Sequence, residues 1–494
     1  MTDAASHDDP PHRYQVLADD LSNRIARGLL KPGNRVPSVR ELCRIYSASP
    51  ATVIHALHLL EDNGLVEARP RSGFFVRRHG KQLAAPQQCA APSLPQAIEL
   101  DEHHRLATEF RHNVGDDSLG RARIDPDYYP CVALQKLMTQ IARRDPHTLA
   151  CHPPVGGDLR LRTQLARRSV HLGCDWQPEE IMVTHGDTQA IATCLRLVAQ
   201  PGDVIAIQSP SNISLLNLLE TMHMRVLEIP SHPCNGLSVD ALAFALKHEK
   251  IAACVLSANF PTPTGSLMSD AAKQRTVALL AEHRVPLIEE DTLGDFYFGN
   301  RRPPPFKAFD KGGNVLYCVD LSTLLGIGLS LGFVVTGRYR LTFEQAQFTA
   351  SEPPPLLFQQ TVAAFMESGQ YEPYLRRLRS TLADTTDAYR CAVAEYFPAQ
   401  ARLSCAEGGF LLWVELPRGV DTSELQRRAL AHDIRFAPGR FFSHERSFEN
   451  CLRLNAGFAF TPAIEAAIAT LGRLATELVA ESAQAGSAAR PTLQ

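Results

Sequence analysis

The sequence predicts an α/β protein with two folded parts: an N-terminal winged helix-turn-helix and a large doubly wound, mostly parallel sheet. Two short capped helices and a hairpin pattern come first, and a segment rich in Ala, Pro and Gln follows them. Beyond it, buried strand patterns alternate with helices over most of the chain. The predicted boundaries are a winged helix at 12–79, a linker at 80–103, the large domain at 104–480 and a flexible tail at 481–494.

Composition restricts the class of protein. The chain has 494 residues, 45% of them hydrophobic and 21% charged, with a net charge of −3. These values are typical of globular proteins with ample core, and they argue against a chain that coats nucleic acid along its whole length. The twelve cysteines form no CxxC pattern, so we expect reduced thiols and no zinc site. The N-terminus lacks the pattern of a signal peptide, which favours a cytoplasmic protein.

One nearly uncharged run is the best candidate for a membrane span. Residues 315–335 read VLYCVDLSTLLGIGLSLGFVV, and Asp320 is the only acidic side chain among them. A charge near the middle of a span is costly, and three glycines interrupt the run. We therefore expect a buried strand and loop here, and no membrane partner.

The first 80 residues contain the signals of a helix-turn-helix. An apolar stripe from Val16 to Leu29 predicts a first helix. Ser38 with Glu41 forms the pattern of a capping box, and Ser49 followed by Pro50 starts another helix. Two β-patterned stretches surround Pro-Arg-Ser-Gly, as in a hairpin wing.

Charge favours DNA as the partner of this part. Residues 13–78 contain eleven basic and six acidic side chains, a net charge of +5. Phosphate contacts need such a local excess, and the helix that begins after Ser49 would enter the major groove. The alternative is a helical module that only dimerises.

The segment closely resembles the winged helix of GntR-family bacterial regulators, through G-x-x-x-P-G-x-x-x-PS-x-R-E-L, L-E-x-x-G-L and R-x-R-S-G-x-x-V. The resemblance implies phosphate or base contacts by Arg40 and Thr52, and a wing that enters the minor groove. Pro50 departs from the family, since many relatives have a basic residue there. The implied DNA-binding residues are Ser38, Arg40, Ser49, Thr52, His55, Arg71, Ser72 and Gly73. For His55, an exposed side chain without a DNA contact is an open alternative.

Five loops of the large domain are the places to look for a ligand. They follow the predicted strands that end near Thr184, Ile207, Leu256, Ile288 and Cys318. Ligands of doubly wound sheets bind beyond the carboxyl ends of the strands.

At these loops the chain resembles fold-type I aminotransferases, through VTHGDTQAI, PTPTGSLMSD, LIEEDTLGDFYFG, GGFLLWVELP and CLRLNAG. Together with the winged helix, this identifies it as similar to the MocR-type regulators. The resemblance implies a smaller C-terminal α+β subdomain, a homodimer, and pyridoxal phosphate (PLP) as the family cofactor.

The residues that PLP chemistry needs are replaced. PLP enzymes form a Schiff base with a lysine. The resemblance places Thr323 at that lysine and Ser330 at the arginine that binds the phosphate. Lys307 is no substitute, because relatives carry a lysine there too. The degenerate positions are Cys151, Asp187, Asn212, Thr262, Glu290, Leu293, Thr323 and Ser330.

These replacements predict a regulator that is not an enzyme and holds no covalent PLP. Its large domain would dimerise the protein and sense a small effector, with Arg453 as a possible carboxylate anchor or, alternatively, the partner of a buried carboxylate. The competing hypotheses are a PLP-responsive regulator, an aminotransferase with unconventional residues, and a dimerisation scaffold without a ligand.

Overall fold

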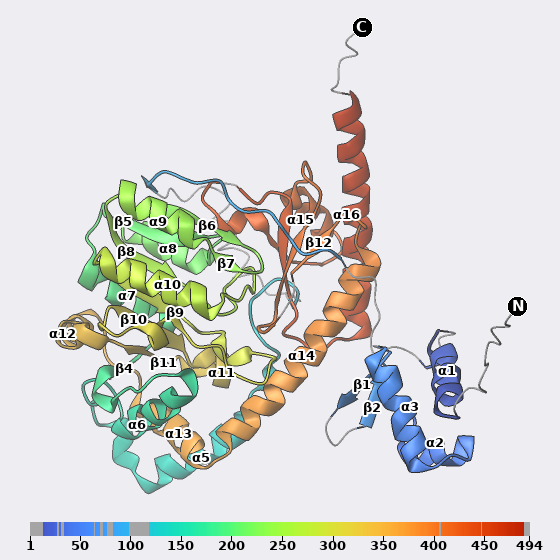
Figure 1. The fold of residues 1–494 in the computed structure, drawn as a ribbon. Helices are drawn as coiled ribbons and strands as arrows, with labels where there is room; N and C mark the ends of the chain where they lie inside the picture. The colour runs from blue at the N-terminus through green and yellow to red at the C-terminus, as the bar shows by residue number, and fades with distance from the viewer. Residues whose placement is uncertain are drawn as a thin grey trace, which may run out of the picture. The chain divides into compact units, whose positions relative to one another are not determined.

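A computed structural model shows two compact units, Met1–Gln82 and Leu83–Gln494 (Figure 1). It describes residues 13–26, 29–30, 34–63, 65–69, 73–76, 83–97, 118–404, 407–445 and 447–488.

The N-terminal unit is the predicted winged helix-turn-helix. Its elements are α1 (Arg13–Ala26), α2 (Val39–Tyr46), α3 (Pro50–Asp62), β1 (Val66–Arg69) and β2 (Gly73–Val76). Leu17 and Leu21 of α1 are buried with Val53 and Leu57 of α3. The predicted stripe was wrong at its ends, since Val16 is 53% and Leu29 72% exposed. The helix ends at Ala26, so Leu29 lies beyond it.

Local capping explains where the two helices of the motif begin. The Ser38 hydroxyl accepts a bond from the Glu41 N–H, and the Glu41 carboxylate accepts from the Ser38 N–H at 2.8 Å, which confirms the capping box. The Ser49 hydroxyl caps α3 by accepting from the Thr52 N–H at 3.2 Å, with Pro50 at the first position of the helix. β1 and β2 pair antiparallel, with Arg69 opposite Gly73, so the wing is a hairpin. Gly73 has φ +98°, a conformation that favours glycine.

The large unit contains the predicted mostly parallel sheet. Its order is β3-β6-β5-β8-β9-β10-β11-β4, with β7 paired to β6. The strands are β3 (Gln96–Ala97), β4 (Ile181–Thr184), β5 (Val204–Ser209), β6 (Arg225–His232), β7 (Gly236–Leu237), β8 (Ile251–Leu256), β9 (Leu287–Glu290), β10 (Val315–Asp320) and β11 (Gly332–Val335). β5, β6, β8, β9 and β10 run parallel, whereas β11 is antiparallel to both β10 and β4.

Helices cover both faces of this sheet (Figure 1). Ile205 and Ile207 pack with α7, α8 and α12, whereas Val204 and Ala206 pack with α9 and α10, as the two-residue period of a strand requires. The helices of the sheet region are α5 (Cys131–Arg144), α6 (Leu159–Arg168), α7 (Gly186–Val198), α8 (Ile213–Thr221), α9 (Val239–His248), α10 (Asp270–Glu282), α11 (Ser322–Leu325), α12 (Arg340–Ala350) and α13 (Leu356–Glu367).

The C-terminal part forms the smaller α+β subdomain. An antiparallel sheet has the order β12-β13-β15-β14 and packs with long helices. These elements are α14 (Tyr371–Tyr396), β12 (Arg402–Leu403), β13 (Leu411–Glu415), α15 (Thr422–Leu430), β14 (Ala437–Pro438), β15 (Cys451–Asn455) and α16 (Pro462–Ala488).

Two predicted boundaries differ from the structure. Residues 83–97 belong to the large unit: the backbone N–H groups of Gln87 and Gln88 donate to Glu415, and β3 adds a strand beside β6. The Ala, Pro and Gln content of this segment predicted a linker. Composition does not reveal these contacts, because they are made mainly by backbone groups. The C-terminal helix continues to Ala488, past the predicted limit at 480.

The uncharged run folds as a strand, two helical turns and a strand. β10 and β11 pair antiparallel, with α11 and a 3-10 turn between them. No helix among the described residues is long and apolar enough to cross a membrane.

Candidate functional site

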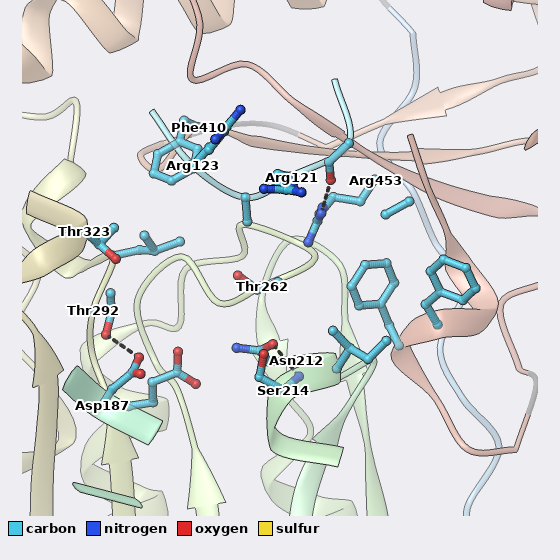
Figure 2. Close-up of a pocket in the computed structure, with 18 of the residues that line it drawn as sticks. Arg121, Arg123, Asp187, Asn212, Ser214, Thr262, Thr292, Thr323, Phe410 and Arg453 are labelled. Atoms are coloured by element: carbon cyan, nitrogen blue, oxygen red, sulfur yellow. Dashed lines mark hydrogen bonds between the residues drawn. The ribbon is translucent and has the colours of Figure 1, made fainter. Parts of the chain in front are cut away.

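A cavity of about 610 Å³ lies in the large unit, against the carboxyl ends of the parallel strands (Figure 2). Side chains from the loops after β4, β5, β8, β9 and β10 line it, together with residues of the C-terminal subdomain. This is the edge of the sheet at which the sequence predicted a ligand.

The cavity brings together most of the predicted residues. Six of the eight degenerate positions line it, and Arg453 does too: these are Asp187, Asn212, Thr262, Glu290, Leu293 and Thr323. Cys151 and Ser330 do not line it, and both are exposed. Ser330 has φ +48°, in the turn before β11.

Thr323 is held by its neighbour Asp320. Its hydroxyl donates to Asp320 Oδ2 at 2.8 Å, and its backbone N–H donates to the same oxygen at 3.2 Å. The Ser322 N–H donates to the other carboxylate oxygen at 2.9 Å. Asp320 therefore caps the turn after β10 and fixes the Thr323 side chain beside the cavity.

One side of the cavity is acidic. Asp187 lies in the first turn of α7, and Glu290 ends β9. Thr292 links the first turn of α7 to the end of β10. Its hydroxyl donates to Asp187 at 3.0 Å and accepts from the backbone N–H of Asp320 at 3.1 Å. Among the described residues, no ion pair links Asp187, Glu290 or Asp320 to a basic side chain.

Burial and mutual repulsion favour the neutral forms of these acids. Burial, and then the charge of Asp187, raises the pKa of Glu290 to about 8, although Asn212 offsets part of this with a hydrogen bond. The same two causes raise the pKa of Asp320 to about 6. Burial also raises the pKa of Asp187, and hydrogen bonds from Thr292 and Thr188 oppose the effect.

The two acidic residues beside Glu290 do not line the cavity and instead hold neighbouring segments in place. Glu289 points to the other face of β9, where it accepts from the backbone N–H groups of Phe306 and Lys307 at 2.6 and 2.8 Å. Asp291 accepts from Arg302 at 2.7 Å and from Tyr317 at 2.8 Å. Glu290 is thus the acid of this run that faces the cavity.

Arg453 lies on the other side of the cavity. Figure 2 shows it beside Arg121, across the cavity from Asp187. Its guanidinium donates to the Gly120 carbonyl and lies 5.2 Å from the Phe442 ring centre, and only 6% of the residue is exposed. Its Nε has no hydrogen-bond partner within the described part of the chain, and burial lowers the pKa of Arg453 to about 10. Among the described residues, no ion pair joins Arg453 to a carboxylate.

Sequence reasoning missed several residues of the site, among them two arginines and a threonine. Arg121 and Arg123 line the cavity from an irregular segment, and Thr292 from the loop after β9. Of these, only Thr292 could have been predicted to lie near the site, because it follows a predicted strand. Arg121 and Arg123 stand in no motif, and packing against the second subdomain places them here.

No lysine lines the cavity among the described residues. Lys307 donates to Asp310 at 3.0 Å and to the Val315 carbonyl at 2.7 Å. Lys273 is fully buried and donates to Asn259 at 2.8 Å. No lysine follows Lys311 in the sequence.

The predicted DNA-binding residues lie at the start of the two motif helices and at the wing. Arg40 is exposed in α2, and the hydroxyls of Ser49 and Thr52 lie 2.8 Å apart at the start of α3. The exposed His55 stacks on Tyr14, with ring centres 4.1 Å apart. Arg71 and Ser72 lie outside the described residues.

Known proteins match both units. Residues 13–76 match the gntR family of bacterial regulatory proteins, and residues 127–464 match aminotransferase class I and II. The HTH-type transcriptional regulators YdcR and YjiR of Escherichia coli are each 30% identical, over 94% and 93% of this chain and 99% and 98% of their own.

The solved structures support the same assignment for the large unit. It resembles LysN, an alpha-aminoadipate aminotransferase from Thermus thermophilus, with a TM-score of 0.71 and 26% identity over 78% of this chain and 96% of that one. The chain therefore belongs to the GntR family of DNA-binding bacterial regulators, in the MocR-type group that joins a winged helix to an aminotransferase class I and II domain.

Proposed function

We propose that this regulator controls transcription from the bacterial cytoplasm without a PLP Schiff base. In this proposal its large unit joins two copies and senses a small ligand that carries an anionic group. The observation that carries it is the Thr323 side chain, a hydroxyl bonded to Asp320 at the place of the family lysine, in a cavity with no lysine among its described lining residues. A hydroxyl cannot form an imine.

The charge of the cavity supports the proposal. The first turn of a helix normally attracts a phosphate. At α7 that turn carries Asp187, whose carboxylate would repel one. Arg453 is the group suited to an anionic end of the ligand, because it is buried and has no carboxylate partner among the described residues.

Exposed apolar side chains support the pairing of two copies. Leu149 is 77%, Val155 57% and Phe348 83% exposed. Large apolar side chains that group together on a surface mark interaction sites. Their segments are neighbours, because His152 Nδ1 and Glu352 Oε2 lie 3.9 Å apart. Two-fold pairing would give the operator two half-sites.

Mixing the purified chain with PLP is expected to give no aldimine absorbance band and no borohydride-reducible adduct, because no amine of the described residues faces the cavity. The visible spectrum before and after borohydride measures this, with LysN as a positive control. A reducible band, mapped to a lysine of this chain, would favour the alternative of a PLP-responsive regulator or an unconventional aminotransferase.

Changing Arg40 to alanine is expected to weaken DNA binding about tenfold and to lower the slope of log affinity against log salt by about 1, as for a lost phosphate contact. The measurement is fluorescence anisotropy at several salt concentrations, with a duplex that the wild-type chain selects from a random pool. Arg427→Ala is the matched control, since Arg427 is an exposed arginine of the large unit. Equal losses in both variants would speak against a contact by Arg40.

A further inference from the structure

The exposed face of α3 lacks the side chains that most often read base edges. The thirteen residues of this helix include no arginine, lysine, asparagine or glutamine, which are the side chains that make bidentate contacts with guanine or adenine. Val53, Ala56, Leu57 and Leu60 are buried in the core of the N-terminal unit. Between positions 51 and 58, the exposed residues are Ala51, Ile54, His55 and His58. The face is therefore made of two histidines and two apolar residues.

Both histidines already have partners within the N-terminal unit. His55 stacks on Tyr14, with ring centres 4.1 Å apart. His58 Nδ1 lies 3.1 Å from Glu61 Oε2, and the Glu61 carboxylate also accepts from the Ala68 N–H at 2.9 Å. These contacts hold the two imidazole rings toward α1 and toward the wing, so the apolar residues are the ones left to face a partner.

Ile54 is the large apolar side chain of this face, and 41% of it is exposed. Ala51 lies three residues earlier on the same side of the helix and is too small to keep a partner away from Ile54. DNA is the partner that the charge fits, because residues 13–78 carry a net charge of +5 and Arg40 and Arg44 are exposed on α2. The second helix of such a motif places its N-terminal residues against base edges in the major groove.

The major groove offers an apolar side chain one matching group, the C5 methyl of thymine. We propose that Ile54 contacts a thymine methyl in the major groove and so specifies thymine at the position that it faces. This assignment goes beyond the DNA binding that follows from the family, because it names a residue that determines specificity and the chemical group that it reads. It is independent of the ligand proposed for the large unit.

Replacing thymine with uracil, one position at a time, tests the contact. The parent probe is the duplex that the full wild-type chain selects from a random pool. Uracil lacks the methyl but keeps the O4 acceptor and the base pair. We expect fluorescence anisotropy to show at least one position at which uracil weakens binding about fourfold, the effect of one methyl group removed from water. Equal binding of the parent duplex and every uracil duplex would overturn the proposal.

Two variants assign that loss to its side chain. Ile54→Ala keeps a residue that favours helices at an exposed position, and it should bind the thymine and uracil duplexes equally at the sensitive position. Its salt dependence should match that of the wild type, because no phosphate contact is lost. Ile45→Ala is the matched control, since Ile45 is 50% exposed on α2, and it should keep the preference for thymine. An Ile54→Ala variant that retains every wild-type preference for thymine over uracil would overturn the assignment.

Discussion

Replacing Arg302 with leucine is expected to destabilise the large unit by about 3–5 kcal/mol, because the change leaves the buried Asp291 without its cation and the buried Asp295 with Arg168 alone. Arg302 is 5% exposed and donates to Asp295 at 2.9 Å and to Asp291 at 2.7 Å. Burial alone would raise the pKa of Asp295, but the charges of Arg168 and Arg302 hold it below its ordinary value. Leucine fills space but can supply neither charge nor donors.

The two tryptophans make this loss measurable. Trp176 and Trp413 are both buried in the large unit, so their fluorescence during urea unfolding reports that unit alone. Arg301→Leu is the matched control, because Arg301 is the adjacent residue and is exposed. Its unfolding midpoint should stay close to that of the wild type. The loss in Arg302→Leu should shrink toward about pH 4, where unpaired carboxyl groups take up protons. A loss equal to that of Arg301→Leu would contradict the network.

The fold was largely predictable because its signals are local. Ser38 and Ser49 fix the start of two helices through their own hydroxyls, and the apolar runs that end near Leu256 and Ile288 are strands because they are buried on both faces. The segment from 83 to 97 was missed because its contacts use backbone groups. Composition alone cannot distinguish such a segment from a free linker.

The candidate site was predictable where a residue follows a strand in a recognisable motif. Asp187, Glu290 and Thr323 could be placed in this way, and all three line the cavity. Arg121 could not, because it reaches the cavity only after the C-terminal subdomain packs against the sheet region. That no carboxylate among the described residues pairs with Arg453 is likewise a property of the folded chain, since acidic residues are common throughout the sequence.

Glu290 gives the large unit a stability that depends on pH. Burial and the charges of Asp187, Asp291 and Asp320 raise its pKa from 4.5 to about 8 in the folded chain. The folded state therefore binds a proton that the unfolded chain releases at lower pH, and stability falls as the pH rises from about 4.5 to about 8. Asp320 on β10 and Asp187 on α7 contribute in the same direction, because their pKa values are also raised.

Changing Glu290 to glutamine should remove most of this dependence, because the amide stays neutral and relieves the repulsion on Asp187 and Asp320. Without ligand we expect the melting temperature of the variant to exceed that of the wild type by about 2–4 °C near pH 9, and the difference to vanish below about pH 5. Scanning fluorimetry across that range measures it. The control is Glu282→Gln, which changes an exposed carboxylate at the end of α10 and should follow the wild type. A wild type more stable than the variant near pH 9 would mean that a basic group neutralises Glu290 in solution.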